Sequence, residues 1–350
     1  MFEELKGVPR LLMHVELKPI QGDRFQPTGF ADLGAAVYER PDGKRMLLVE
    51  SAQSMANRLE HVCLDGDGPD IASELNGLPY VRVKINASVD GKKTELVTSS
   101  LVEAHRLNSP FIIANKKFAE SFSTGTGYAG TGQINWKRVA KILFSYDPNS
   151  LLHGVFMANL GDGRMRVPRV ISAFIEAEDA REANSGGVKN NPLDPTGRLR
   201  VEGFDKDVYG NVPYHRSEFT AGRVVAYFNL DLALLAGYGL PDHARQLLIA
   251  LALYKVRRLL AAGLRLRTAC DLTPLSDLRI DAPASFNVPD ESVLRDAVKC
   301  EIRECSKAGD FCDPAITELS VDASFKAKKS AQNKEEAAND DQSDEDSAED

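Results

Sequence analysis

Apolar residues follow strand-like and helix-like patterns along the chain, and together these patterns predict an α+β fold. Apolar clusters or alternation predict the main β-strands at 10–17, 46–49, 167–176, 222–228 and 266–272. Helical spacing predicts helices at 51–62, 242–262 and 289–307. If the strand at 46–49 and the last helix are set aside, the order is βαββαβ, which is that of ferredoxin-like and RRM-like folds.

Long segments between these elements predict large insertions into the core. The first insertion, about residues 64–145, is predicted to contain a hairpin, a helix, a short buried strand and a second helix, at 80–97, 101–107, 111–113 and 135–143. Residues 151–158 and 167–176 are both strand-like and are expected to form a long hairpin of the central sheet.

A second excursion is predicted at 178–220, which is poor in apolar residues and rich in Gly, Asn, Asp and Pro. Either a functional, thumb-like element or a floppy surface insert fits this composition. We expect residues 1–325 to form a single elaborated domain, with 326–350 as a disordered acidic tail.

Polar side chains gather at the start of the helix at 51–62. Ser51 is a good N-cap, because its hydroxyl can accept a backbone N–H of the first turn. The expected apolar face consists of Ala52, Met55, Leu59 and Val62. The side chains off this face are Gln53, Ser54, Asn57 and Arg58. Free N–H groups, hydroxyls, amides and a guanidinium suit a phosphate, although an ordinary capped helix has the same start.

Charge is distributed unevenly along the 350 residues, whose formal net charge is −8. Residues 331–350 contain one Lys and nine Asp or Glu, so residues 1–330 are formally neutral. A neutral body can carry a basic groove, but it will not be drawn strongly to every duplex. A solubilising role is the favoured interpretation of the tail, and repulsion of stray nucleic acid is the alternative.

The five cysteines do not predict a disulfide framework. Their odd number, and a start without a basic or apolar signal, favour a reducing cytoplasm. The spacing of Cys300, Cys305 and Cys312 is not that of a zinc knuckle, so we expect no metal. The most apolar run, Leu247–Tyr254, is too short to span a membrane.

No nucleophile–base set, carboxylate pair or P-loop can be singled out by spacing. A literal G-x-G-x-x-G lies at 125–130, but no strand runs into its first glycine, so a loop over a ligand path is favoured over a dinucleotide site. We interpret His105 and His153 as packing or hydrogen-bonding residues.

The helix start and its flanks carry a resemblance to a known family. Ser51-Ala52-Gln53-Ser54 with Arg58, after the Gly- and Pro-containing loop 19–30, resembles the crRNA-binding signature of the RAMP superfamily. With 106–110 and 147–154, the chain resembles the backbone subunit of type I CRISPR (Cascade) complexes, subtype G (formerly U), over roughly residues 8–320. Ala56 stands where better-known relatives have a lysine, which shifts phosphate contact toward Arg58 or other residues.

The resemblance implies a non-catalytic, crRNA-binding subunit in the cytoplasm, without a cofactor or metal. Its partners would be crRNA, target DNA through the guide heteroduplex, further copies in a helical filament, other Cascade subunits and a recruited helicase-nuclease. The expected RNA contacts are Lys18, Gln21, Arg24, Ser51, Gln53, Ser54, Asn57 and Arg58, with Arg106, Ser109, Lys137 and Arg164 as further candidates. Lys189 and Asn190 are the thumb candidates.

Two other functions remain open from the sequence. Related type III complexes cut target RNA with an aspartate in the loop after the first strand, and Asp23 and Asp32 lie in that loop here. A nucleotide-cofactor enzyme built on the glycine loop is the second alternative.

Overall fold

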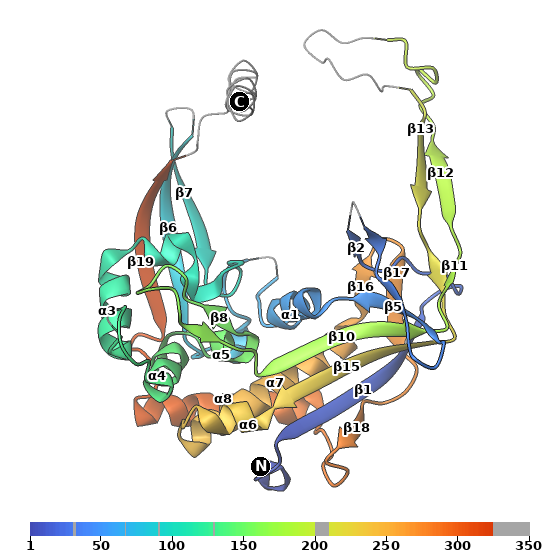
Figure 1. The fold of residues 1–350 in the computed structure, drawn as a ribbon. Helices are drawn as coiled ribbons and strands as arrows, with labels where there is room; N and C mark the ends of the chain where they lie inside the picture. Colours follow the sequence, from blue (N-terminus) through green and yellow to red (C-terminus); the bar gives the residue numbers. More distant parts are fainter. Residues whose placement is uncertain (31–32, 67, 90–91, 129, 200–209, 325–350) are drawn as a thin grey trace, which may run out of the picture.

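The computed structural model describes residues 1–30, 33–66, 68–89, 92–128, 130–199 and 210–324 (Figure 1). A curled antiparallel sheet forms its centre. The strands follow one another across this sheet in the order β16 (Leu264–Arg267), β17 (Cys270–Pro274), β1 (Arg10–Pro19), β15 (Arg223–Asp231), β10 (Ile171–Glu178), β5 (Arg45–Glu50) and β4 (Val37–Glu39). An eighth strand, β18 (Arg279–Ala282), also pairs with β1. The predicted α+β class is confirmed.

The inner face of the sheet is buried by helices. Along β1, Leu11, Met13, Val15 and Leu17 are buried, while the alternate residues are more exposed, as expected for a sheet covered on one side. The predicted helices are present as α1 (Ala52–His61), α7 (Asp242–Ala262) and α8 (Glu291–Ala308). α7 packs against both α1 and α8, and these helices lie on the same side of the strands (Figure 1).

A smaller sheet stands beside the central one. The predicted hairpin forms as β6 (Tyr80–Val89) and β7 (Lys92–Ser99), and β19 (Ile316–Ser324) pairs in parallel with β6. Sequence reasoning did not predict β19. Its position next to β6 brings the C-terminal part of the described chain onto the first insertion.

Two strand predictions between α1 and β10 are wrong. Residues 111–113 belong to helix α2 (Pro110–Ile113), and residues 151–153 belong to helix α5 (Pro148–His153). Only the short β8 (Val155–Phe156) follows α5, and it pairs with β9 (Arg166–Val167) outside the central sheet. Residues 101–107 form turns and a 3₁₀ segment, η3 (Arg106–Asn108), in place of the predicted helix.

The glycine motif closes a helix. α3 (Lys116–Thr126) contains Gly125, and Gly127 caps the helix with a left-handed φ of 68°. Arg138, in α4 (Trp136–Tyr146), donates hydrogen bonds to the carbonyls of Gly125 (2.5 Å) and Thr124 (2.9 Å). These glycines therefore end a helix and do not lead from a strand into one, so they lack the geometry of a dinucleotide loop.

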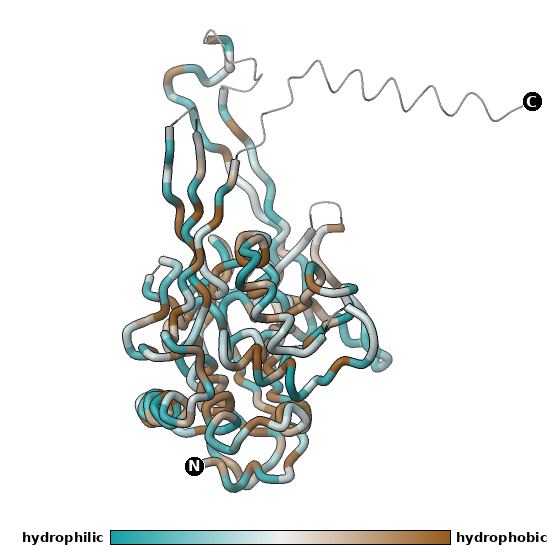
Figure 2. The backbone as a smooth tube through the Cα atoms, turned by 90° about the vertical axis from the view of Figure 1, so that its left-hand side faces the viewer, coloured by the Kyte–Doolittle hydropathy of each residue, from teal (hydrophilic) through white to brown (hydrophobic). Residues whose placement is uncertain are grey.

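The excursion predicted at 178–220 forms a two-stranded arm. β12 (Ser185–Lys189) pairs with β13 (Val212–Arg216), and β11 (Arg181–Glu182) pairs with β14 (Phe219–Thr220) at the base. The arm and the smaller sheet rise from the same end of the body (Figures 1 and 2). The two-residue strands β2 (Gly29–Phe30) and β3 (Gly34–Ala35), and the short segments η1 (Glu3–Leu5), η2 (Ser73–Leu75) and α6 (Leu232–Gly237), complete the described elements.

Candidate nucleic-acid interface

The start of α1 has the cap that the sequence predicts. The Ser51 hydroxyl accepts the Ser54 N–H at 3.2 Å, and no acidic residue occupies the first turn. Gln53 and Asn57 are exposed and are joined by a 3.1 Å hydrogen bond. The predicted apolar face needs one correction: Ala52 is exposed and Ala56 is buried together with Met55 and Leu59.

The buried carboxylate of Glu50, just before α1, is a shared hydrogen-bond acceptor for side chains of α1 and β16. Glu50 is 1% exposed and accepts hydrogen bonds from the Ser54 hydroxyl, Arg58 Nε (2.8 Å) and Arg267. Arg58 also donates to the Leu266 carbonyl at 2.6 Å and so fastens α1 to β16. Arg58 thus has a structural role, and its contact with phosphate stays a prediction.

Arg169 is the cation that lies at the helix start itself. Its guanidinium donates to the Ala52 carbonyl (3.1 Å) and to Gln53 Oε1. Burial and the neighbouring Arg106 lower the pKa of Arg169, an effect that Glu60 partly offsets. Two guanidinium groups therefore lie close together beside α1.

A cavity of about 820 Å³ adjoins this pair of arginines. Its wall comes from η3, the end of α5 and the β8–β9 ribbon, and includes His105, Arg106, Arg166 and Arg169. Arg166 is exposed, and its guanidinium carbon lies 4.2 Å from the centre of the Phe156 ring. Among the described residues, no aspartate or glutamate lines this cavity. A cationic, partly aromatic wall of this kind suits an anionic ligand with planar rings.

His153 adds a neutral donor to the cavity wall. It is 1% exposed, and Lys255 Nζ donates to its Nε2 at 2.6 Å. Burial, followed by the charges of Lys255 and Arg106, holds the pKa of His153 well below its usual value. The proton of the neutral ring is then on Nδ1, which has no hydrogen-bond partner in the described part of the chain. The hydrogen-bonding role expected for His153 is present, and one donor remains unused.

A second hollow, of about 360 Å³, continues along α1. It is lined by Gln53 and Asn57, and it shares Ala104 and Arg106 with the first cavity. The two carboxylates in its wall are occupied: Glu60 pairs with Arg106 (2.5 Å), and Glu103 accepts the Ser109 hydroxyl (2.8 Å). The two hollows form one continuous polar surface along α1, which is basic at the end that carries Arg166 and Arg169. We call this surface the α1 groove.

The loop after β1 reaches the same helix start from the other side. Lys18, Gln21 and Arg24 are all exposed, and Arg24 lies 3.8 Å from Glu218 at the base of the arm. The Thr28 N–H donates to the Val49 carbonyl at 2.9 Å, directly before α1. The structure thus brings this loop, the arm base and the helix start to one end of the sheet.

The remaining predicted residues are more scattered. Ser109 does not lie at the surface as an RNA contact would require, because its side chain is completely buried and caps α2. Arg106 is largely enclosed and donates to the Gly154 carbonyl (3.0 Å) as well as to Glu60. Arg164 is exposed but pairs with Asp162, and Lys137 is exposed beside Gly239.

The thumb candidates Lys189 and Asn190 are exposed on the arm, at the end of β12. Nothing tests their role or that of the other predicted contacts, which all stay predictions. Of the alternative catalytic residues, Asp23 is exposed in the loop after β1, and Asp32 lies outside the described residues.

Sequence reasoning missed Arg166 and Arg169. The signal was available, because Arg164, Arg166 and Arg169 recur within six residues around the start of the predicted strand at 167–176. Only the fold shows that Arg169 contacts α1 and that Arg166 lines the same cavity.

None of the described helices combines the length and the apolar composition that a membrane crossing requires. No functionally curated protein is similar to the chain in sequence.

Several solved structures resemble the chain weakly. A chain of a "CRISPR RNA-guided surveillance complex, pre-nicking" has a TM-score of 0.38 and 13% identity, covering 85% of this chain and 88% of that one. Csc2 from Thermofilum pendens has a TM-score of 0.29 and 10% identity, covering 88% and 80%. A chain of a further "CRISPR RNA-guided surveillance complex" has a TM-score of 0.32 and 11% identity, covering 94% and 99%. Because all three TM-scores are below 0.5, no conclusion about this chain is based on these similarities.

The match to a protein family is specific. Residues 11–182 match the family described as CRISPR-associated protein GSU0053, and this segment contains β1, α1, the first insertion and most of the α1 groove. Over residues 11–182, the chain is therefore similar to a CRISPR-associated family.

Proposed function

We propose that this protein is a non-catalytic, crRNA-binding backbone subunit of a type I CRISPR Cascade complex of subtype G. The match of residues 11–182 to a CRISPR-associated family supports this role. The observation that carries the proposal is the α1 groove. Arg166 and Arg169 line a cavity whose described wall lacks carboxylates, and Arg169 also contacts the start of α1. A single-stranded guide offers the phosphates and bases that such a surface accommodates.

The arrangement of the core supports an RNA-binding module. In the order β17, β1, β15, β10, the four core strands are antiparallel neighbours, and α1 and α7 lie in the two crossovers. This is the arrangement of a ferredoxin-like, RRM-like fold, with 64–145 and 178–220 as insertions. In the proposal, residues 1–325 act as one domain.

Guide recognition by this subunit would not depend on sequence. Guanidinium and amide groups of the α1 groove hold phosphates and riboses, while the guide bases remain free to pair with target DNA. Further copies stack head to tail along the guide, and the arm of one copy reaches over the guide bound to the next. Other Cascade subunits cap this heterologous filament in the cytoplasm, and a helicase-nuclease is recruited to it.

The first experiment is to express the chain with a CRISPR array and its neighbouring subunits, and to sequence the RNA that co-purifies. We expect uniform RNAs in which repeat-derived ends flank a spacer. An absence of nucleic acid, or random cellular RNA, would overturn the proposal.

A charge variant then tests the groove. Arg166→Glu combined with Arg169→Gln should weaken guide binding by at least about tenfold, about 1.4 kcal/mol. It should also reduce the slope of log affinity against log salt by roughly 1.4, since about two phosphate contacts are lost. Arg303→Glu, at an exposed position of α8, is the matched control and should leave binding unchanged. Equal affinities for both variants, with unchanged thermal unfolding, would remove the α1 groove from the proposal.

The non-catalytic role is tested separately. A labelled RNA complementary to the guide should remain intact with the assembled complex. Cleavage that disappears in Asp23→Ala or Asp32→Ala would assign the chain as a target-RNA endonuclease.

A further inference from the structure

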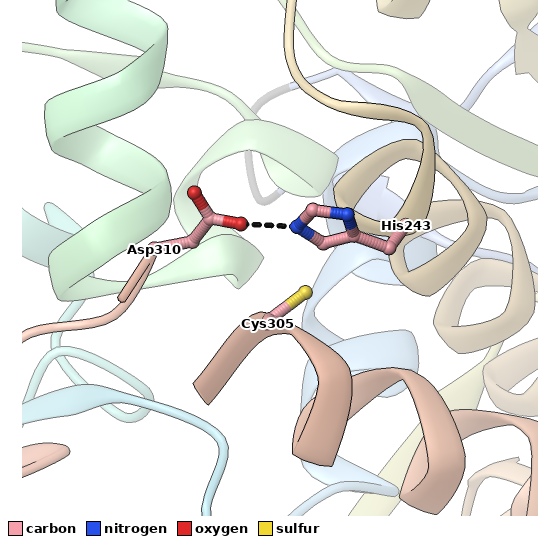
Figure 3. A group of neighbouring side chains, drawn as sticks. All are labelled: His243, Cys305 and Asp310. Carbon is pink, nitrogen blue, oxygen red and sulfur yellow. Dashed lines mark hydrogen bonds and ion pairs between the residues drawn. The ribbon is translucent and has the colours of Figure 1, made fainter. Parts of the chain in front are cut away.

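Three side chains with metal-ligating atoms meet between α7 and α8, away from the α1 groove. His243 lies in the first turn of α7, Cys305 in the last turn of α8, and Asp310 directly after α8. Figure 3 shows the imidazole, the thiol and the carboxylate directed toward one another. Their ligand atoms all lie within 4.8 Å of one another, and His243 Nε2 is hydrogen-bonded to the Asp310 carboxylate.

Local backbone geometry fixes two of these residues together. Gly309 ends α8 with a left-handed φ of 72°, which a glycine adopts without strain. This turn directs the chain back, so that the Asp310 N–H donates to the Cys305 carbonyl at 3.0 Å. Asp310 and Cys305 are thereby held side by side before any ligand arrives, and α7 supplies His243 opposite them.

The chemistry of the set suits zinc. Zinc is bound by histidine nitrogen, cysteine sulfur and carboxylate oxygen, and a site with three protein ligands keeps its fourth position for water. Cys305 is fully buried, whereas the His243 and Asp310 side chains are 31% and 13% exposed. An ion can therefore enter from the His243 side and reach a sulfur that water hardly contacts.

Carboxylates lie close to the thiol. Asp310 belongs to the cluster itself, and Glu301 is a second acidic neighbour of Cys305. A divalent ion would compensate both the thiolate and the Asp310 carboxylate, and the displaced thiol proton would pass to solvent. Glu301 lies one turn before Cys305 on α8.

We propose that His243, Cys305 and Asp310 bind one zinc ion, with water as the fourth ligand, and that this ion fastens the start of α7 to the end of α8. The sequence did not suggest such a site, because Cys300, Cys305 and Cys312 lack zinc-knuckle spacing. In the fold, Cys305 instead joins a histidine and an aspartate. The proposal does not depend on guide binding.

The test uses the full chain after removal of any affinity tag and of bound metal with a chelator. On titration with Co²⁺ we expect one ion per chain, with visible d–d bands and an ultraviolet thiolate-to-cobalt band that Zn²⁺ displaces. Cys305→Ser should abolish the thiolate band. Cys312→Ser, which changes a half-buried cysteine seven residues away, is the matched control and should retain it.

A second readout keeps the test decisive if Cys305→Ser does not fold. His243→Gln changes a partly exposed side chain and should weaken Co²⁺ binding by at least about tenfold, the loss that even outer-shell changes bring. Zinc should raise the melting temperature of the wild-type chain and not that of His243→Gln. No saturable binding by the wild type, or equal binding by His243→Gln, would overturn the proposal.

Discussion

At the residue scale, the buried Glu50 decides how the start of α1 is presented. Its carboxylate accepts from Ser54, Arg58 and Arg267, side chains that come from α1 and β16. Removal of one partner from a buried ion pair leaves an uncompensated charge, which costs more than the pair itself contributes. Glu50 therefore matters for the groove although it does not face it.

We expect Glu50→Ala to lower the free energy of unfolding by about 3–5 kcal/mol, because Arg58 and Arg267 lose their shared acceptor. Urea denaturation of the purified chain measures this loss. Glu3→Ala is the matched control, since Glu3 forms an exposed pair with Lys6, and exposed pairs contribute little to stability. Similar stabilities of the two variants would contradict the role assigned to Glu50.

At the scale of elements, two segments that were predicted as strands from their apolar residues form helices, because residues that start a helix precede them. Both helices that were predicted as strands begin with a capping residue followed by proline, Ser109-Pro110 for α2 and Asp147-Pro148 for α5. The side chain of each cap accepts a backbone N–H of the first turn, and proline at N1 is already set for a helix. The apolar residues that follow are buried within helices, so apolar content alone could not distinguish the two structures.

The arm extends away from the body as a pair of strands (Figure 1). β12 and β13 pair with each other, and the base is closed by a 2.8 Å hydrogen bond from the Ala183 N–H to the Glu218 carbonyl. The arm also exposes Val188, Leu193 and Tyr214, which is unusual for a ribbon without a partner surface.

We expect replacement of residues 184–217 by Asn-Gly to leave the thermal unfolding of the chain nearly unchanged, because a two-residue turn can join strands that already pair. The same variant should lose assembly along the guide, measured as the mass of the complex that co-purifies with crRNA. A large fall in melting temperature would show that the arm supports the body, and unchanged assembly would argue against a thumb role.

At the scale of the whole molecule, charge is separated along the sequence. The formal charge of −8 equals that of residues 331–350, so the body is neutral overall and its basic groove is a local feature. An acidic segment on the same chain repels polyanions at long range and is screened by salt.

Truncation after Ser330 should therefore strengthen binding of an unrelated single-stranded RNA at low salt, and the gain should vanish at high salt. Fluorescence anisotropy with a labelled RNA measures both conditions. A full-length variant with the nine acidic residues changed to Asn or Gln separates charge from length and should behave like the truncation. Tighter binding that persists at high salt would exclude an electrostatic cause.

Sequence alone determined the elements whose patterns are long and local. The strand at 10–17, the helices at 51–62 and 242–262, and the cap at Ser51 follow from periodicity and hydrogen-bonding chemistry within a few residues. The basic and amide residues at the start of α1 were visible for the same reason.

Tertiary structure decided what depends on residues that are distant in the chain. Only the fold pairs β19 with β6, places Glu50 where it accepts a hydrogen bond from Arg58, and brings Arg169 to the start of α1. It likewise brings His243 to Cys305 and Asp310. Side-chain partners across the fold are set by packing, which leaves no periodic trace in the sequence, so neither the groove nor the α7–α8 cluster could be predicted from spacing.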